Sequence, residues 1–264
     1  MKKWTTQKIR AMKGRQKVVC LTAYDCATAR LIDRAGIPLI LVGDSLAMTM
    51  LGYDTTLPVT VEQMLHHTAA VARGVTSALV VADMPFLSFQ VSVGEAIANA
   101  GRFLKEAGAD AVKIEGGRIR EETVRGLVAN GIPVLGHVGM TPQSVREFGG
   151  FKVQGRRPAE AQAVLEDARA LEAAGVFAIV LECIPSDLAA EITAAVSVPT
   201  IGIGAGAACD GQVLVTHDML GIQTGVTPRF AKHYAELGDT MLRAFETYRR
   251  EVETGAFPGP EHGF

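Results

Sequence analysis

Ala111-Val-Lys-Ile-Glu-Gly-Gly117 is an apolar run of strand length that carries two charges, Lys113 and Glu115, where apolar packing needs none. A parallel strand buried on both faces is a continuous run of Val, Ile and Leu, and a charge inside it is costly unless it is paired or binds metal. Similar runs ending in polar or ionisable residues occupy 39–45, 78–85, 133–139 and 178–185. Their ends add Asp44, Ser45, Asp83, His137 and Glu182. Since parallel strands of a barrel end at one face, these side chains predict one shared pocket there.

Apolar runs and helical patterns alternate along the chain from about residue 18. We expect strands at 18–25, 39–44, 78–84, 111–115, 133–138, 178–183, 199–203 and 213–217. Helices are expected at 27–35, 61–73, 94–107, 120–129, 158–174 and 187–195. Eight strands joined by segments long enough for right-handed crossovers favour an α/β fold, a (β/α)8 TIM barrel, over the alternative of a doubly wound open sheet.

The ends of the chain and one connection depart from this repeat. Residues 204–212 are rich in glycine and too short for a full helix, so we expect the barrel to be irregular there. We expect a helical extension at the N-terminus and a C-terminal helix from Pro228 to Gly255. The chain shows no linker and no segment of different amino-acid composition, so residues 1–264 are predicted to form a single barrel catalytic domain.

Composition excludes several classes of function. The 264 residues carry a net charge of −2 and are 48% hydrophobic, which predicts neither a nucleic-acid partner nor a polybasic membrane patch. The apolar stretches fall short of the roughly 18 residues of a membrane span, and the cationic start lacks the apolar core of a signal peptide. Four cysteines without CxxC spacing predict free thiols and a cytoplasmic enzyme.

Asp44 and Asp83 end neighbouring strands and suit a hard divalent cation. Mg²⁺ prefers oxygen ligands and is commonly held by one or two carboxylates together with water and substrate oxygens. Glu115 adds a third carboxylate, close to the same ion but outside its direct ligands. The alternative interpretation is that each aspartate caps the following helix or pairs with a lysine.

Lys113, His137 and Glu182 offer acid–base chemistry. Lys113 shares strand parity with Glu115, so both can point into the barrel, where the lysine could form a Schiff base or neutralise a bound carboxylate. The neighbouring carboxylates favour a charged lysine. Glu182 is the candidate base, since desolvation would raise its pKa, but a buried Glu182 could instead pair with Lys113 or an arginine. His137 is a candidate hydrogen-bond donor or a structural residue.

Gly202-Ile-Gly-Ala-Gly-Ala207 follows a strand and matches the dinucleotide pattern GxGxxA. The pattern lies at the seventh strand and precedes no long helix, so it is weak evidence for a dinucleotide site. A phosphate cup and a close approach of backbone to ligand are the alternatives, and we favour the close approach.

Together, several motifs resemble the ketopantoate hydroxymethyltransferase family, in family order and over nearly the whole chain. They are Leu-Val-Gly-Asp-Ser at 41–45, Thr-Leu-Pro-Val-Thr at 56–60, His-His-Thr-Ala-Ala-Val at 66–71, Ala-Asp-Met-Pro-Phe at 82–86, Val-Lys-Ile-Glu-Gly-Gly at 112–117, Gly-His-Val-Gly-Met-Thr-Pro-Gln at 136–143, Gly-Phe-Lys-Val-Gln-Gly-Arg at 150–156, Leu-Glu-Cys-Ile-Pro at 181–185 and Ile-Gly-Ile-Gly-Ala-Gly at 201–206. One departure is Ala47, where the family usually has glycine.

The resemblance implies a barrel of the phosphoenolpyruvate/pyruvate type. It also implies transfer of the one-carbon unit of 5,10-methylenetetrahydrofolate to 3-methyl-2-oxobutanoate, the first step of pantothenate synthesis. Position by position, it implies one Mg²⁺ per subunit at Asp44, Asp83 and Glu115, with Glu115 hydrogen-bonding the metal's waters. Glu182 is implied as the base, and the implied keto-acid contacts are Asp44, Ser45, Asp83, Lys113 and His137.

The resemblance and the high apolar content together predict a homo-oligomer, a decamer of two stacked five-membered rings. Two competing functions remain open at this point. A metal-dependent lyase of the isocitrate lyase type would share the fold and metal but cleave a C–C bond without folate. A non-catalytic barrel would bind the keto acid without turnover.

Overall fold

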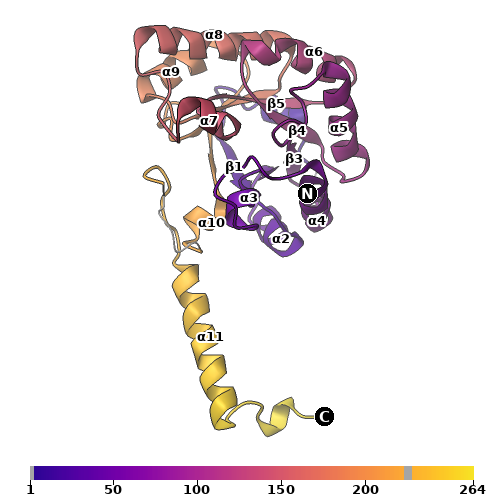
Figure 1. Ribbon diagram of the computed structural model, residues 1–264, viewed down its shortest axis with the longest axis vertical. Helices are drawn as coiled ribbons and strands as arrows, with labels where there is room; N and C mark the ends of the chain where they lie inside the picture. Colours follow the sequence, from indigo (N-terminus) through magenta and orange to yellow (C-terminus); the bar gives the residue numbers. More distant parts are fainter. Residues whose placement is uncertain (1–2, 223–227) are drawn as a thin grey trace. The chain divides into compact units, whose positions relative to one another are not determined.

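The computed structural model describes residues 3–222 and 228–264, and within these ranges eight parallel strands form a closed barrel (Figure 1). Each strand pairs with the next in sequence, and β8 returns to β1 with Val18 opposite Gly211. The strands are β1 (Val18–Thr22), β2 (Leu39–Val42), β3 (Leu79–Asp83), β4 (Ala111–Glu115), β5 (Val134–Gly139), β6 (Ala178–Glu182), β7 (Thr200–Ile203) and β8 (Gly211–Leu214). The predicted (β/α)8 barrel is confirmed, and the open sheet is excluded.

Helices follow the first six strands and surround the barrel (Figure 1). They are α2 (Cys26–Arg34), α4 (Val61–Gly74), α5 (Val93–Lys105), α6 (Glu121–Ala129), α8 (Pro158–Ala174) and α9 (Ser186–Ala195). Shorter elements lie between them: α3 (Leu46–Thr49), η1 (Arg118–Arg120), η2 (Pro142–Ser144) and α7 (Val145–Phe148). The predicted ends of the helix at 61–73 are confirmed by a capping box at Thr60 and the final residue Gly74.

The first strand is shorter than expected because Asp25 has another role. The strand ends at Thr22, and the Asp25 side chain accepts hydrogen bonds from the backbone of Ala27 and Thr28 at 2.8 and 2.9 Å. An aspartate that satisfies the free N–H groups of a first helical turn is an N-cap. Asp25 therefore begins α2 rather than ending β1.

The seventh connection is irregular, as expected, and residues 204–210 contain no helix. Gly206 has a φ of +83°, and a Cβ built there would lie 2.5 Å from Ser186 Oγ. The close approach at this glycine is thus to the start of α9, which gives a packing reason for the residue rather than the approach to a ligand that we favoured.

Two apolar layers position the ionisable strand ends. One layer lies between the outer surface of the barrel and the helices, and it includes Ile40, Val80 and Val112. The other fills the barrel itself, with Leu79 and Val81 of β3 and Ala111 of β4 among its members. Because side chains alternate along a strand, Asp83, Lys113 and Glu115 continue the inner set toward the carboxyl end. The side chains that point into the barrel are therefore apolar toward its amino end and ionisable at its carboxyl end.

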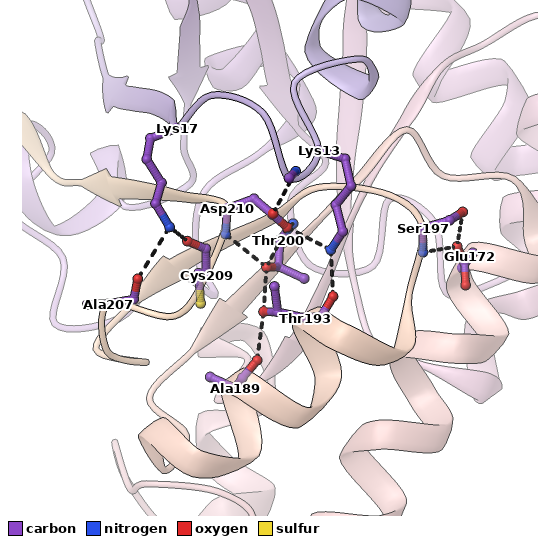
Figure 2. A network of polar contacts seen from close by, with 11 residues as sticks. Lys13, Lys17, Glu172, Ala189, Thr193, Ser197, Thr200, Ala207, Cys209 and Asp210 are labelled. Atoms are coloured by element: carbon purple, nitrogen blue, oxygen red, sulfur yellow. Dashed lines mark hydrogen bonds and ion pairs between the residues drawn. The ribbon is translucent and has the colours of Figure 1, made fainter.

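The N-terminal extension, which includes α1 (Thr6–Arg10), closes the other end of the barrel. Ile9 and Met12 pack with the inner apolar set. Figure 2 shows the polar contacts beside it, where Asp210 accepts hydrogen bonds from Lys13 Nζ at 2.8 Å and from the Thr200 backbone at 2.9 Å. The amino-terminal face of the barrel is thereby filled and pinned, so the open face is the one carrying the ionisable strand ends.

The chain divides into two compact units, Met1–Val215 with the whole barrel and Thr216–Phe264. The second unit contains α10 (Thr216–Met219), α11 (Leu237–Thr254) and η3 (Pro260–His262). The predicted C-terminal helix begins nine residues late, because the backbone of Tyr234, Leu237 and Gly238 donates to the carbonyls of 219–221. The prediction of one catalytic domain over 1–264 stays a prediction. Among the described helices, none has the length and apolarity needed to cross a bilayer.

Candidate active site at the carboxyl end of the barrel

Strand register brings the predicted ionisable residues together. Asp83 lies opposite Lys113 across β3 and β4, and Glu115 lies opposite His137 across β4 and β5. Each of these four residues, taken as a whole, is at most 4% exposed. With Asp44 and Glu182, which end the neighbouring runs, they form a group that we call the mouth cluster: Asp44, Asp83, Lys113, Glu115, His137 and Glu182.

Lys113 is the cation at the centre of this cluster. Its Nζ lies 2.7 and 2.6 Å from the two carboxylate oxygens of Asp83 and 3.6 Å from Glu115 Oε1. Burial alone would lower the pKa of Lys113, but the charges of Asp83, Glu115 and Asp44 outweigh it and raise this pKa above its ordinary value. Lys113 is therefore an ammonium suited to pairing with a carboxylate, and not the neutral amine that a Schiff base requires.

The cluster holds more acid than this lysine can neutralise. Burial and the neighbouring charges of Asp83 and Glu115 raise the pKa of Asp44 well above its ordinary value. Glu115 has the opposite shift: burial opposes ionisation, but Lys113 and His137 lower its pKa. The excess of buried carboxylate is the electrostatic signature of a site that accepts a further cation.

His137 lies between two carboxylates. Its Nδ1 is 3.6 Å from Glu115 Oε1, and its Nε2 is 3.2 Å from Glu182 Oε2. Burial and Lys113 oppose protonation, yet Glu115 and Glu182 raise the pKa of His137 to about 9. Neither ring nitrogen reaches hydrogen-bond geometry, and Glu115 Oε1 is likewise buried without a partner. These buried atoms face opposite charges but make no hydrogen bond within the protein, so they are available to hydrogen-bond a polar ligand.

Glu182 is the most exposed acid of the cluster. Its side chain is 17% exposed, against 2% for Asp83 and 3% for Glu115. It faces His137, so the predicted alternative of a structural pair with Lys113 is not what the structure shows. The next residue, Cys183, has a φ of +46°, which is uncommon outside glycine and typical of strained backbone at functional sites.

Two further residues had no assigned role in the sequence analysis, one beside the cluster and one in contact with it. Tyr24 Oη lies 2.8 Å from Ser45 Oγ, and Ser45 follows Asp44 at the start of α3. Gln143, in η2, donates from its side chain to Asp44 Oδ2 at 3.0 Å and from its backbone to Glu115 Oε2 at 3.0 Å. A polar residue four positions after a strand end gives no periodic signal, so only its motif pointed to Gln143.

The arrangement was also compared with the geometry of a metal centre. In the part of the chain that the structure describes, no group of three or more His, Cys, Asp or Glu side chains is placed to hold a metal ion. Asp83 directs both oxygens at Lys113, which occupies the position of a cation beside it. Asp44 and Asp83 nevertheless adjoin, because the Asp44 backbone N–H donates to Asp83 Oδ2 at 3.2 Å. Mg²⁺ is commonly held by one or two carboxylates with water and substrate oxygens, so Asp44 and Asp83 match its ligand chemistry although both oxygens of Asp83 contact Lys113.

Comparisons with known proteins agree on one family. The family model described as ketopantoate hydroxymethyltransferase matches residues 3–260. The 3-methyl-2-oxobutanoate hydroxymethyltransferase of Syntrophus aciditrophicus (strain SB) is 57% identical over 264 residues, covering 100% of this chain and 97% of the relative. Among relatives, that of Moorella thermoacetica is 57% identical over 261 residues, covering 98% of this chain and 97% of its own.

Solved structures share the fold at low identity. Phosphonopyruvate hydrolase has a TM-score of 0.64 at 14% identity and covers 98% of this chain and 92% of its own. Phosphoenolpyruvate phosphomutase from Streptomyces platensis subsp. rosaceus has a TM-score of 0.64 at 15% identity, with coverage of 95% and 88%. These likenesses confirm the predicted (β/α)8 barrel fold, and its assignment to the phosphoenolpyruvate/pyruvate type stays a prediction.

Proposed function

The chain belongs to the ketopantoate hydroxymethyltransferase family, and on that premise we propose that the mouth cluster is where it converts 3-methyl-2-oxobutanoate to ketopantoate. The observation that carries this proposal is the convergence of buried carboxylates, an ammonium and a protonated imidazole on one end of the barrel. Several of their polar atoms are buried and make no hydrogen bond within the protein. The one-carbon unit comes from 5,10-methylenetetrahydrofolate, and the reaction belongs to pantothenate biosynthesis.

The donor set fits one Mg²⁺. Asp44 and Asp83 would supply hard oxygen ligands, and Glu115 would accept hydrogen bonds from water bound to the metal. The excess of buried carboxylate supports this assignment, because a divalent cation would relieve the repulsion that raises the pKa of Asp44. When bound there, the metal supplies Lewis-acid polarisation of the keto acid's oxygens.

The remaining residues bind the keto acid and move its proton. Lys113 and Ser45 hold the substrate carboxylate. His137 is protonated because Glu115 and Glu182 raise its pKa, and it donates to a substrate oxygen. Glu182 takes the proton from C3, and the electrons of that C–H bond form the enolate. The enolate carbon attacks the methylene carbon of the folate as the bond from that carbon to one folate nitrogen breaks. Water then displaces the second nitrogen and supplies the hydroxyl group, and the two nitrogens take one proton from Glu182 and one from water as tetrahydrofolate leaves.

An omission assay tests this function. Product formation should require the keto acid, methylenetetrahydrofolate and Mg²⁺ together, and ketopantoate should be the product detected by mass spectrometry. A lyase with this fold would cleave its substrate without folate, and a binding protein would retain keto acid without product. Turnover that is independent of folate, or binding without any turnover, would therefore overturn the proposal.

We extend the proposal to assembly and compartment. The described residues of α11 include none that is buried, yet it carries an apolar stripe formed by Met241, Phe245, Tyr248 and Val252. On the barrel, Val19 of β1 is 45% exposed and borders a cavity of about 390 Å³ beside β8. We infer that copies of the chain bury these surfaces against each other in a homo-oligomer, a decamer by family resemblance. Four free cysteines support a cytoplasmic location.

A further inference from the structure

Gln143 occupies an unusual position for a long neutral amide. It lies in the short turn η2 after β5, behind Pro142, and is 5% exposed. A buried amide is costly unless its donors and acceptor are satisfied, so its partners show what the residue is held for. Those partners come from the carboxyl ends of β2 and β3 and from the loop between β3 and α5.

The side chain of Gln143 is fully oriented by its contacts. Nε2 donates to Asp44 Oδ2 at 3.0 Å and to the Met84 carbonyl at 2.9 Å, which uses both amide hydrogens. Oε1 accepts from Gln90 Nε2 at 3.1 Å. Because two of these partners are acceptors and one is a donor, the amide fits in only one orientation.

Gln143 hydrogen-bonds one oxygen of each of two carboxylates, those of Asp44 and Glu115. Its side chain holds Oδ2 of Asp44, and its backbone N–H holds Oε2 of Glu115 at 3.0 Å. In each carboxylate Gln143 fixes one oxygen, and the other oxygen of Glu115 faces Lys113 Nζ and His137 Nδ1 at 3.6 Å each. For Glu115 that remaining oxygen, Oε1, is the buried atom without a hydrogen-bond partner.

We propose that Gln143 is the positioning residue that orients Asp44 and Glu115 for the divalent cation of the proposed function, on which this inference rests. A neutral donor is suited to the task because it binds the ionised form of each carboxylate without neutralising the negative charge that attracts the cation. Gln143 itself contacts neither metal nor substrate in this assignment.

Two variants test the proposal. Gln143→Met keeps the length and volume of the side chain but removes both donors, and Gln143→Asn keeps the amide but withdraws it from Asp44. Calorimetric titration of MgCl2 into protein saturated with 3-methyl-2-oxobutanoate, without folate, measures metal affinity apart from turnover. We expect about 10- to 100-fold weaker Mg²⁺ binding in both variants, as for other residues that orient metal ligands.

Gln63→Met is the matched control, because it makes the same substitution at a glutamine whose side chain accepts a hydrogen bond from the Thr60 backbone in the α4 capping box. It should lower the melting temperature while leaving Mg²⁺ affinity unchanged. Wild-type affinity in either folded Gln143 variant would overturn the role of Gln143, and if Gln143→Met fails to fold, Gln143→Asn decides. If the wild-type protein binds no Mg²⁺ with the keto acid, the proposed function itself fails.

Discussion

Glu182 differs from the other acids of the mouth cluster in exposure and in partner, and both differences make its role testable. Replacing it by glutamine should slow exchange of the C3 hydrogen of 3-methyl-2-oxobutanoate with deuterium by roughly 10²- to 10⁴-fold, the usual contribution of a positioned base. Exchange followed by NMR needs no folate, so it isolates proton removal from one-carbon transfer.

The same variant should stay folded. Lys113 is paired with Asp83 and Glu115, so Glu182→Gln leaves no buried ammonium uncompensated. Glu191→Gln, an exposed substitution on α9, serves as the control for exchange and melting temperature. Exchange at the wild-type rate in folded Glu182→Gln would exclude Glu182 as the base and leave His137 as the next candidate.

Asp44→Asn should separate metal binding from stability. Removing this carboxylate relieves its repulsion with Asp83 and Glu115, so the variant without metal should melt at or above the wild-type temperature. Saturating Mg²⁺ with the keto acid should stabilise wild-type protein by about 2.7 kcal/mol at a hundredfold excess over Kd, and the variant by far less. An equal shift in melting temperature for both proteins would contradict the metal assignment.

Strand parity made the core of the cluster predictable from sequence. Lys113 and Glu115 had to share a side of their strand, and parallel strands had to end together. Gln143 and Tyr24 were not predictable in this way, because their contacts depend on how loops fold back over the barrel end. The partial exposure of Glu182 was also not predictable from the pattern, since a run of apolar neighbours predicts only that the strand is buried.

At the scale of an element, Asp33 fastens α2 to the start of β3. Its carboxylate accepts hydrogen bonds from the backbone of Thr76, Ser77 and Ala78 at 2.9, 3.1 and 2.7 Å. Burial opposes ionisation, but these bonds hold the pKa of Asp33 below its ordinary value. Asp33→Asn should cost about 3 kcal/mol of unfolding free energy at pH 7, because an amide leaves some of the buried N–H groups unpaired.

The effect of Asp33 should depend on pH with a defined sign. Because its folded-state pKa is depressed, its stabilisation is present above the ordinary aspartate pKa of about 3.9 and is lost as pH falls through the folded-state value. Urea unfolding should therefore show a wide gap between wild type and Asp33→Asn at pH 7 that narrows below about pH 4. The exposed control Asp54→Asn should show no such gap. A gap that stays constant with pH would refute the ionised form as the source.

Elements were predicted well where local sequence decides them and poorly where distant backbone does. Thr60 and Gly36 marked helix ends correctly, since an N-cap and a left-handed residue after a C-cap act within one turn. The start of α11 was missed because the backbone of 234–238 bonds to 219–221, a choice that periodicity does not encode.

For the whole molecule, the closed barrel explains why one face carries the chemistry. The N-terminal extension fills the opposite end with Ile9 and Met12, and Asp210 ties it to Lys13. The ionisable strand ends lie at the opposite, carboxyl side, so we expect substrate and cation to enter from there. The repeat of eight strand runs made this architecture predictable. The surface beside β7 and β8, where residues 204–210 form no helix, was not predictable until the strands were placed.

The assembly of the protein is the last property to test, and α11 is the place to test it. Phe245 lies at the middle of the apolar stripe and is 63% exposed. Phe245→Asp should reduce the mass measured by light scattering coupled to size exclusion, because a buried unpaired charge opposes association. Arg250→Asp, about 1.4 turns further along α11 and on the face away from the stripe, introduces the same side chain and should leave the mass unchanged. A monomeric wild type at micromolar concentration would contradict the oligomer, and an unaltered Phe245→Asp oligomer would remove α11 from its interface.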